Sequence, residues 1–301
     1  MKKKIIIAGG TGFLGFHFAK ACLKKKWIVV SVSRKKPKKK RFLKNVKYIQ
    51  ADITDKENLQ KKLKGHMNAV FLINFAGEAE HKNIKKTFLS HYRGLKNLSE
   101  LFSNKFLIKF IQIGTSFEYG KIKSPHREHF KLQPISNYAK AKTLASKELL
   151  NNYKKNNFSA LIVRPYQIYG PNQDLNRFIP RLISNCIKNK IFPCTSGVQF
   201  RDFLFIDDFI NFIEKIIINK KLKNEVFNIG YGKPKKIKNI ILLVKRLIGQ
   251  GGPVIGKVKM RNEESITSYP DISKAFKLTG WRPKVRFNSG LKKTINYYQK
   301  N

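Results

Sequence analysis

Short apolar runs alternate with amphipathic segments through the first half of the chain. In the amphipathic segments apolar residues recur with a period near the ~3.6 residues of a helix, whereas the short runs are almost continuously apolar. Continuous apolarity is typical of strands covered on both faces, so the alternation predicts an α/β fold with a doubly wound parallel sheet. We expect strands at 5–8, 27–32, 46–49, 69–75, 107–113 and 160–165, and helices at 13–25, 83–103 and 136–154.

A glycine-rich turn, G-G-T-G-F-L-G at 9–15, follows the first expected strand and opens the first expected helix. The spacing Gly-x-Gly-x-x-Gly permits a tight turn, close approach of the backbone to a pyrophosphate, and tight packing of helix on strand. The helix N-terminus would hold the phosphates of a dinucleotide. Standing alone, the motif could be an ordinary glycine turn, but here the strand and helix accompany it. The expected dinucleotide contacts in the turn are Gly9, Gly10, Thr11, Gly12, Phe13, Leu14 and Gly15.

The pattern becomes irregular in the second half, with frequent prolines and the stretch G-Q-G-G-P at 249–253. We therefore expect a Rossmann-type NAD(P)-binding domain at 1–170, to which parts of 200–230 return. A smaller C-terminal lobe at 171–301 would mainly bind substrate. This lobe is expected to consist of loops and a few helices at the carboxyl edge of the sheet, where ligands bind in this architecture.

The end of the second expected strand indicates which dinucleotide binds. NAD enzymes carry an acidic residue near this point, but here Ser33 and Arg34 follow the strand and no acid occurs before Asp52. Because an arginine can bind a 2′-phosphate, the sequence favours NADP(H), with NAD(H) as the alternative. Asp52 could accept from the adenine amino group or cap a helix, as Thr54 or Asp55 could. Further expected cofactor contacts are Ile53, Asn74, Ala76, Gly77 and Pro165.

Tyr138 and Lys142 are four residues apart on an expected helix, and so lie on one face of it. A free tyrosine has a pKa of ~10 and exchanges protons near neutrality only when a nearby cation stabilises its phenolate. Thr115, at the end of the fifth strand, can hydrogen-bond the same substrate oxygen. In a lysine-rich chain this spacing also arises by chance around a surface tyrosine. The pair lies downstream of a dinucleotide site, however, and this position favours a redox centre in which Tyr138 and Lys142 also lie near the nicotinamide.

The formal net charge of +45 would ordinarily indicate a nucleic-acid or membrane partner. Lysine is spread over nearly every segment, however, as AT-rich coding bias would produce. The tightest basic run, at 34–41, is expected to be a solvated loop. We therefore expect no nucleic-acid partner, although the charge would attract an anionic cofactor and substrate.

No apolar run approaches the ~20 residues that span a bilayer, so no membrane span is expected. Cys22, Cys186 and Cys194 have neither the spacing of metal ligands nor the density of a disulfide scaffold. The sequence thus gives no indication of a metal, and a reducing cytoplasm is the simplest setting.

The motifs together resemble the extended short-chain dehydrogenase/reductase family, specifically its nucleotide-sugar epimerases, dehydratases and reductases. The resemblance covers essentially the whole chain and includes T-S-F-E-Y-G at 115–120, Y-A-K-A-K at 138–142, R-P-Y-Q-I-Y-G-P at 164–171, R-D-F-L-F-I-D-D at 201–208, F-N-I-G at 227–230 and D-I-S-K-A-F at 271–276. It implies that Thr115, Tyr138 and Lys142 form the catalytic triad, and that the helices at 83–103 and 136–154 form a homodimer interface.

The same resemblance implies contacts to a nucleotide-diphosphate sugar. Arg201 would grip the diphosphate, and Arg261 with Glu264 would face the pyrophosphate and ribose; a structural ion pair with Asp202 or Asp207 is the alternative for the arginines. The complete set of expected substrate contacts is Thr115, Ser116, Phe117, Gln167, Arg201, Arg261 and Glu264.

Departures from the family pattern reduce the number of reactions that the chain is expected to catalyse. The 4,6-dehydratases carry an acid pair after the catalytic threonine, where this chain has Ser116 and Phe117. His91 and Gln167 stand where asparagine is usual. The segment 178–203 is similar to the CDP-abequose and paratose synthases, which favours NADPH-dependent reduction of a 4-keto-deoxyhexose for cell-surface polysaccharides. A 4-epimerase with tightly bound NAD is the alternative, and a non-catalytic NADP sensor or RNA-binding protein is a third.

Overall fold

The computed structural model describes residues 2–77, 83–153, 158–260 and 265–300. The expected substrate contacts Arg261 and Glu264 lie outside the described residues. The chain forms two compact units, each assembled from three segments. The first comprises Met1–Glu118, Pro134–Arg164 and Ile210–Phe227, and the second comprises Tyr119–Gln133, Pro165–Phe209 and Asn228–Asn301.

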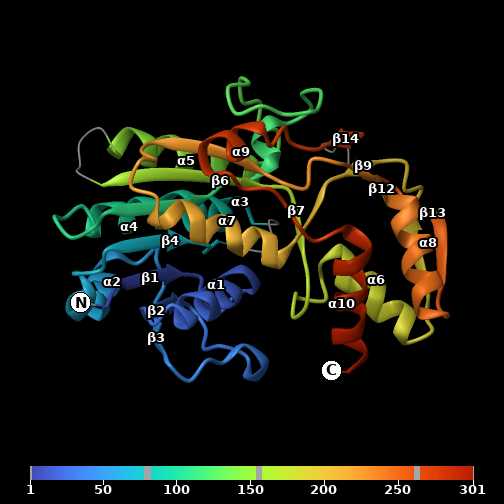
Figure 1. The fold of residues 1–301 in the computed structure, drawn as a ribbon, viewed down its shortest axis with the longest axis horizontal. Coiled ribbons are helices and arrows are strands. Elements are labelled where there is room, and N and C mark those ends of the chain that lie inside the picture. Colours follow the sequence, from blue (N-terminus) through green and yellow to red (C-terminus); the bar gives the residue numbers. More distant parts are fainter. Residues whose placement is uncertain (1, 78–82, 154–157, 261–264, 301) are drawn as a thin grey trace. The chain divides into compact units, whose positions relative to one another are not determined.

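A seven-stranded sheet forms the centre of the first unit (Figure 1). Its strands are β1 (Lys4–Ala8), β2 (Ile28–Ser33), β3 (Val46–Gln50), β4 (Phe71–Asn74), β5 (Lys109–Ile113), β6 (Ser159–Pro165) and β11 (Glu225–Ile229). They lie in the order β11-β6-β5-β4-β1-β2-β3, and the pairs β1–β2, β1–β4, β2–β3, β4–β5 and β5–β6 are parallel. The six strands expected from the sequence all belong to this sheet, and the predicted Rossmann-type fold class is confirmed.

Helices cover both faces of this sheet. They are α1 (Phe13–Lys24), α2 (Lys56–Leu63), α3 (Ile84–Phe88), α4 (Gly94–Leu101), α5 (Asn137–Tyr153) and α7 (Ile206–Ile218), with a π-helical turn at Leu89–Arg93 between α3 and α4. Alternate strand residues such as Ile6, Val30 and Leu72 share one buried cluster with apolar residues of α2, α4 and α5. Their neighbours Ile5 and Ile7 are also fully buried. The strands are therefore apolar on both faces, which explains their unbroken apolar runs.

The second unit contains helices and small sheets. Its strands are β7 (Gln167–Tyr169), β8 (Ile191–Thr195), β9 (Phe200–Arg201), β10 (Phe203–Phe205), β12 (Lys235–Lys236), β13 (Gly252–Val258) and β14 (Thr267–Ser268), and its helices are α6 (Phe178–Ile187), α8 (Ile237–Ile248), α9 (Ser273–Thr279) and α10 (Phe287–Gln299). β7 pairs with β10, β8 with β13, and β9 with both β12 and β14. The expectation of loops and a few helices was wrong in omitting these strands, several of which are too short to show any apolar period.

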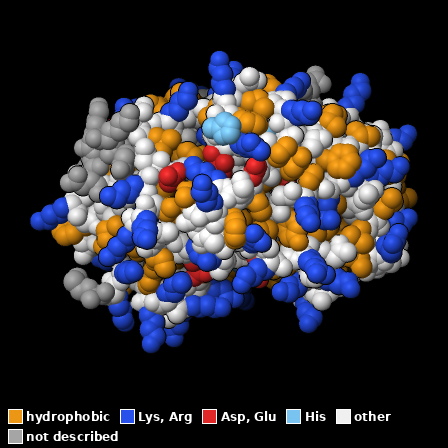
Figure 2. All heavy atoms as spheres, turned by 45° about the horizontal axis from the view of Figure 1, so that its top comes forward, with side chains coloured by type: hydrophobic (Ala, Val, Ile, Leu, Met, Phe, Trp, Pro, Cys, Tyr) orange, Lys and Arg blue, Asp and Glu red, His pale blue; other side chains and the backbone are white. Residues whose placement is uncertain are grey.

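Basic side chains are scattered over the face of the molecule seen in Figure 2, between apolar and neutral ones. This dispersion agrees with a compositional origin for the charge. Within the described ranges, every helix is too short or too polar to cross a membrane.

Candidate active site

The turn between β1 and α1 is packed so closely that side chains would not fit. A Cβ on Gly9 would lie 2.7 Å from the backbone nitrogen of Ala76, and one on Gly15 would lie 2.4 Å from the carbonyl oxygen of Gly9. Gly9 also has a φ of +77°, which glycine adopts without strain. Helix α1 begins after Gly12 with no described side chain capping it. Its first N–H groups are therefore available to an anion, as a dinucleotide cradle requires.

A cavity of about 250 Å³ opens at the carboxyl ends of β1, β2, β3 and β4. It brings together many of the residues predicted to contact the dinucleotide: Gly9, Thr11, Gly12, Ser33, Arg34, Asp52, Ile53, Ala76 and Gly77. Gly10, Phe13, Leu14, Gly15 and Asn74 are not among its lining residues, and Pro165 belongs to the second unit. Five lining residues are absent from the predicted contacts: Val32, Lys35, Ala51, Phe75 and Ser90. The first four adjoin predicted positions, so their places near strand ends could have revealed them; Ser90 carries no such signal.

Asn74 has a supporting role in the turn after β4. Its side-chain amide donates to Oε1 of Gln112 at 2.9 Å, and its Oδ1 accepts from the N–H of Ala76 at 3.0 Å. Both Asn74 and Gln112 are fully buried. The side chain thus fixes the backbone of a cavity-lining residue from behind.

Asp52 and Asp55 have separate tasks after β3. Asp55 is the N-cap of α2 and accepts from the N–H of Asn58 at 3.1 Å. Asp52 lines the cavity, and its Oδ1 accepts from the N–H and the hydroxyl of Thr54, both at 2.9 Å. Of the two uses weighed for Asp52, helix capping therefore belongs to Asp55.

Two of the cavity's lining residues, directly after the end of β2, are basic. Ser33, Arg34 and Lys35 line it, and the hydroxyl of Ser33 accepts from the N–H of Thr11 at 3.4 Å. A second hollow of about 320 Å³ shares Thr11, Ser33 and Lys35 with the first and adds Lys36. The part of the site beyond β2 is thus positively charged.

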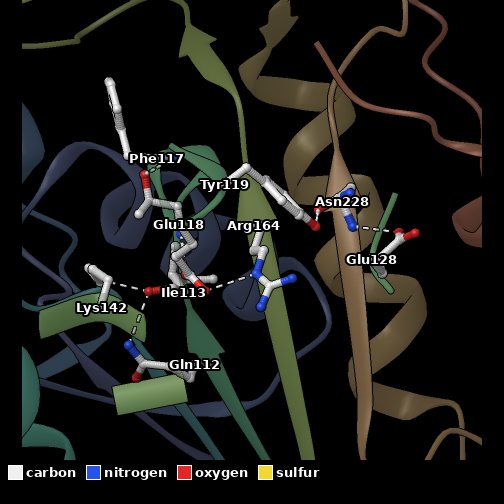
Figure 3. Close-up of polar contacts among 10 residues, drawn as sticks. Gln112, Ile113, Phe117, Glu118, Tyr119, Glu128, Lys142, Arg164 and Asn228 are labelled. Carbon is white, nitrogen blue, oxygen red and sulfur yellow. Dashed lines mark hydrogen bonds and ion pairs between the residues drawn. The ribbon is translucent and has the colours of Figure 1, made fainter. Parts of the chain in front are cut away.

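Lys142 joins α5 to the carboxyl end of β5. Its Nζ donates to the carbonyl oxygen of Ile113 at 2.8 Å, two residues before Thr115 (Figure 3). The lysine is buried, and burial lowers its pKa to about 8; the negative charge of Glu118 acts against this shift. A buried ammonium beside a tyrosine is the arrangement that stabilises a phenolate.

Tyr138 lies one turn before Lys142 on α5 and is partly exposed. Its ring meets the imidazole of His91 edge-on, with 5.1 Å between the ring centroids. On another side it meets the ring of Phe117 at 6.4 Å. The N–H of Phe117 donates to the hydroxyl oxygen of Thr115 at 3.3 Å. The structure therefore places Thr115, Tyr138 and Lys142 in one neighbourhood of the first unit.

The contact of His91 with Tyr138 depends on the π-helical turn Leu89–Arg93 and on Gly77. His91 is buried, and a Cβ on Gly77 would lie 1.9 Å from its Cε1. A glycine is therefore required opposite the imidazole. Sequence reasoning identified His91 as a departure from the family pattern but not as a neighbour of the tyrosine.

The predicted substrate contacts of the second unit engage the backbone around β9. Arg201 donates from Nη1 to the carbonyl oxygens of Phe200 and Ile266, at 2.9 and 3.3 Å. The carboxylate of Asp202 accepts from the N–H groups of Tyr231 and Gly232, and burial raises its pKa to about 6 against the effect of these bonds. In β7, the N–H of Gln167 donates to the carbonyl oxygen of Asp202 at 3.1 Å.

Tyr119 and Asn228, from the F-E-Y-G and F-N-I-G motifs, form a buried pair in the second unit. The hydroxyl of Tyr119 donates to Oδ1 of Asn228 at 2.8 Å, and the N–H of Asn228 donates to Glu128 at 2.8 Å (Figure 3). These motif positions therefore have a structural role. Across the part of the chain that is described, no group of three or more His, Cys, Asp or Glu side chains could hold a metal ion.

Residues 5–230 match the sequence model of the NAD dependent epimerase/dehydratase family. The chain belongs to this family. A relative, UDP-glucuronate 4-epimerase of Thermodesulfobacterium geofontis, is 29% identical over 98% of this chain and 96% of its own length. CDP-abequose synthase of Salmonella typhimurium is 26% identical over 98% of each chain. The solved structure of UDP-glucuronic acid 4-epimerase from Bacillus cereus, in complex with UDP-glucuronic acid and NAD, has a TM-score of 0.87 and 26% identity over 99% of both chains.

Membership of the NAD dependent epimerase/dehydratase family confirms the resemblance to the extended short-chain dehydrogenases and the expectation of an NAD(P)-dependent enzyme. In this chain Ser116 is buried and Phe117 is exposed, and neither side chain can act as an acid or base at neutral pH. The positions that would carry a dehydratase's acid pair therefore supply no acid or base.

Proposed function

We propose that this enzyme uses NADPH to reduce the 4-keto group of a nucleotide-bound 6-deoxyhexose. The observation that carries the choice of cofactor is the lining of the cavity at the end of β2. Ser33, Arg34 and Lys35 occupy the place where an NAD enzyme holds the ribose with an acid, and a guanidinium there suits a 2′-phosphate. NADPH suits net reduction because cells keep it largely reduced.

The glycine turn fits a dinucleotide, because such a cradle needs a turn without side chains. A Cβ on Gly9 would clash with the backbone of Ala76, and one on Gly15 with the backbone of Gly9. The uncapped start of α1 would hold the pyrophosphate, and Arg34 the 2′-phosphate. When bound, the nicotinamide supplies the hydride that adds to C4 of the sugar.

Thr115, Tyr138 and Lys142, all in the first unit, are assigned to the protonation of the sugar's carbonyl oxygen. The hydroxyl of Thr115 donates a hydrogen bond to it and so polarises the carbonyl. As the carbon gains a hydride, Tyr138 gives its phenolic proton to the oxygen, and C=O becomes CH–OH. The ammonium of Lys142, buried beside the tyrosine on α5, stabilises the phenolate that remains.

The substrate class follows from charge and from the relatives. A nucleotide-diphosphate sugar is anionic, and the chain carries a formal net charge of +45. We assign Arg201 to the diphosphate and Ser116, Phe117 and Gln167 to the sugar, with Arg261 and Glu264 beside the nucleoside. CDP-abequose synthase, 26% identical over nearly all of both chains, supports the 4-keto sugar as substrate.

A 4-epimerase is the second candidate. UDP-glucuronate 4-epimerase is 29% identical over 98% of this chain, and the bound cofactor of the solved UDP-glucuronic acid 4-epimerase is NAD. An epimerase would use the same three residues to remove a hydride from C4 and return it to the opposite face. It would retain its oxidised cofactor between turnovers, whereas a reductase must exchange NADP for NADPH.

Cofactor content and a substrate panel test the two candidates. The purified protein is extracted and its dinucleotide identified; it is then incubated with NADPH and CDP-, GDP-, dTDP- or UDP-linked 4-keto-6-deoxyhexoses while absorbance of the reduced cofactor is followed. Exchangeable NADPH and its stoichiometric oxidation support the reductase. Retained NAD with interconversion of UDP-hexoses or UDP-hexuronates supports the epimerase. Cofactor binding without turnover of any sugar would contradict both and favour a sensor.

We also propose that the enzyme is a homodimer built on α3, the π-helical turn and α5. Ile84, Phe88, Leu89 and Leu144 are exposed apolar side chains on these segments, and such a face is normally covered in solution. Light scattering should give twice the chain mass of 34.9 kDa for the unmodified protein and a monomer for Phe88→Glu. A monomer for both proteins would contradict the proposal.

A further inference from the structure

Glu118 and Arg164 form a buried ion pair (Figure 3). Arg164 Nε lies 2.9 Å from Glu118 Oε2, and both side chains are almost completely inaccessible. Arg164 is at the end of β6, and Glu118 is in the short helical turn Ser116–Tyr119 after β5. Two neighbouring strands are thus tied together by opposite charges at their carboxyl ends.

The second oxygen of the same carboxylate holds the backbone of Thr115. The N–H of Thr115 donates to Glu118 Oε1 at 2.9 Å, and the carbonyl oxygen of Thr115 accepts from the N–H of Glu118 at 3.2 Å. Both backbone polar groups of the threonine are therefore bonded to one residue. Hydrogen bonds to an ionised carboxylate are stronger than neutral ones, so this attachment is firm.

Gly114 makes the arrangement possible. A Cβ at this position would lie 2.4 Å from Glu118 Oε1, so any larger residue would displace the carboxylate. The glycine is itself fixed to the sheet, because its N–H donates to the carbonyl oxygen of Val163 at 2.8 Å. The glycine before Thr115 thus provides the space in which the glutamate reaches the threonine's backbone.

We propose that Glu118, oriented by Arg164, is a positioning residue that fixes the hydroxyl of Thr115 for the substrate oxygen. Burying two charges is unfavourable unless their bonds are well made, and an apolar pair of similar volume would stabilise the fold at least as well. Here the ion-paired carboxylate accepts from the backbone N–H of Thr115, whose hydroxyl is assigned to polarise the carbonyl. The inference rests on the proposed function, in that Thr115 must act in catalysis.

A second effect of Glu118 gives the experiment an electrostatic readout. The carboxylate raises the pKa of the buried Lys142, opposing the effect of burial. The ammonium donates to the carbonyl oxygen of Ile113 and is acted on by the charge of Glu118, whose own partner is Arg164; the titratable phenol of Tyr138 lies one turn earlier on the same helix. Removing the negative charge should therefore move any activity that requires protonated Lys142 to lower pH.

Glu118→Gln removes the charge and keeps the shape. We expect kcat to fall at least ten-fold while KM for the sugar and the affinity for NADPH change less than three-fold, because Thr115 acts on the reacting oxygen. The alkaline limb of kcat/KM should shift to lower pH. Lys109→Met is the matched control, because it removes another buried charge of the same unit at the start of β5, whereas Thr115 follows the end of that strand. It should leave kcat per folded molecule and the pH limb unchanged.

Because Glu118→Gln leaves Arg164 buried without its counter-charge, a second variant protects the test against misfolding. Glu118→Leu with Arg164→Met removes both charges and should fold with near-native thermal stability. Its kcat should still be reduced at least ten-fold, since the N–H of Thr115 has lost its acceptor. A stable double variant with the kcat and pH profile of the unmodified enzyme would overturn the inference.

A mutant cycle with Thr115→Ala separates this inference from the proposed function. If Glu118 acts through the threonine, Glu118→Gln should lower kcat much less in the Thr115→Ala background than in the unmodified enzyme. Equal losses in both backgrounds would overturn the positioning role while leaving Thr115 in catalysis. If Thr115→Ala alone left kcat unchanged, the proposed function of the threonine would fail instead.

Discussion

Lys142 donates a hydrogen bond from Nζ to the carbonyl oxygen of Ile113, 2.8 Å away, so α5 is joined to the end of β5 by an ammonium that is itself buried. Replacing it by methionine should lower kcat by ~10²- to 10⁴-fold, because the phenolate of Tyr138 loses its cation. At pH 7 the midpoint of thermal unfolding should stay the same or rise, since a buried charge is removed. Differential scanning fluorimetry beside the NADPH assay measures both; a large fall in the midpoint would indicate a structural lysine.

The pH dependence follows from the same side chain. Burial lowers the pKa of Lys142 to about 8, so kcat/KM should fall as pH rises through about 8, and not only near the ordinary value of 10.5. In the unfolded chain the lysine binds its proton at higher pH than in the fold. Stability relative to Lys142→Met should therefore decrease as pH falls from 10.5 to 8, by about 3 kcal/mol, and change no further below that. Urea unfolding at a series of pH values tests the sign.

Tyr138→Phe should abolish turnover and leave NADPH binding nearly unchanged. The ring would keep its edge-on contacts with His91 and Phe117, so the helix should keep its place, while the proton donor is lost. Fluorescence titration with NADPH and single-turnover assays measure the two effects. A variant with normal turnover would remove the proposed acid.

Arg34→Ala should weaken NADPH by ten-fold or more and NADH by less than two-fold, because only NADPH carries the 2′-phosphate. Calorimetric titration with each cofactor gives the ratio, with Lys24→Ala, at the far end of α1, as the control for lost positive charge. Equal losses for both cofactors would mean that the 2′-phosphate lies elsewhere.

Gly77→Ala should reduce kcat strongly, since the new Cβ would meet the imidazole of His91 at 1.9 Å and displace the ring that borders Tyr138. Gly65→Ala is the matched control, because a Cβ there would meet nothing within 4 Å. It should leave activity and thermal stability unchanged. Comparable losses from both substitutions would show that the effect is a general one of removing glycine.

Much of the first unit could be predicted because its strands are buried on both faces and so read as continuous apolar runs. β11 (Glu225–Ile229) has the same length as β1, but it follows a long insertion and its place beside β6 is fixed by tertiary contacts. β9 and β12 contain two residues each, and no periodicity can be read from two residues.

The candidate site also contains residues that could be predicted from the sequence and residues that could not. Tyr138 and Lys142 could be found because a helical spacing relates them, and the glycine turn because backbone geometry dictates its residues. The pair Glu118 and Arg164 could not, since it joins positions that only the pairing of β5 with β6 brings together. The contact of His91 with Tyr138 has no motif either; a residue unusual for the family was the only signal.

The position of β11 in the chain matters while the protein is being synthesised. β6 is complete long before β11, its neighbour at the edge of the sheet, has been translated. The chain between them contains β7, α6, β8, β9 and β10 of the second unit. Throughout that interval the nascent polypeptide presents an apolar strand with unpaired amides along one margin, which invites association with other chains. A fragment that stops near residue 170 would keep this margin permanently and should be recovered as aggregate.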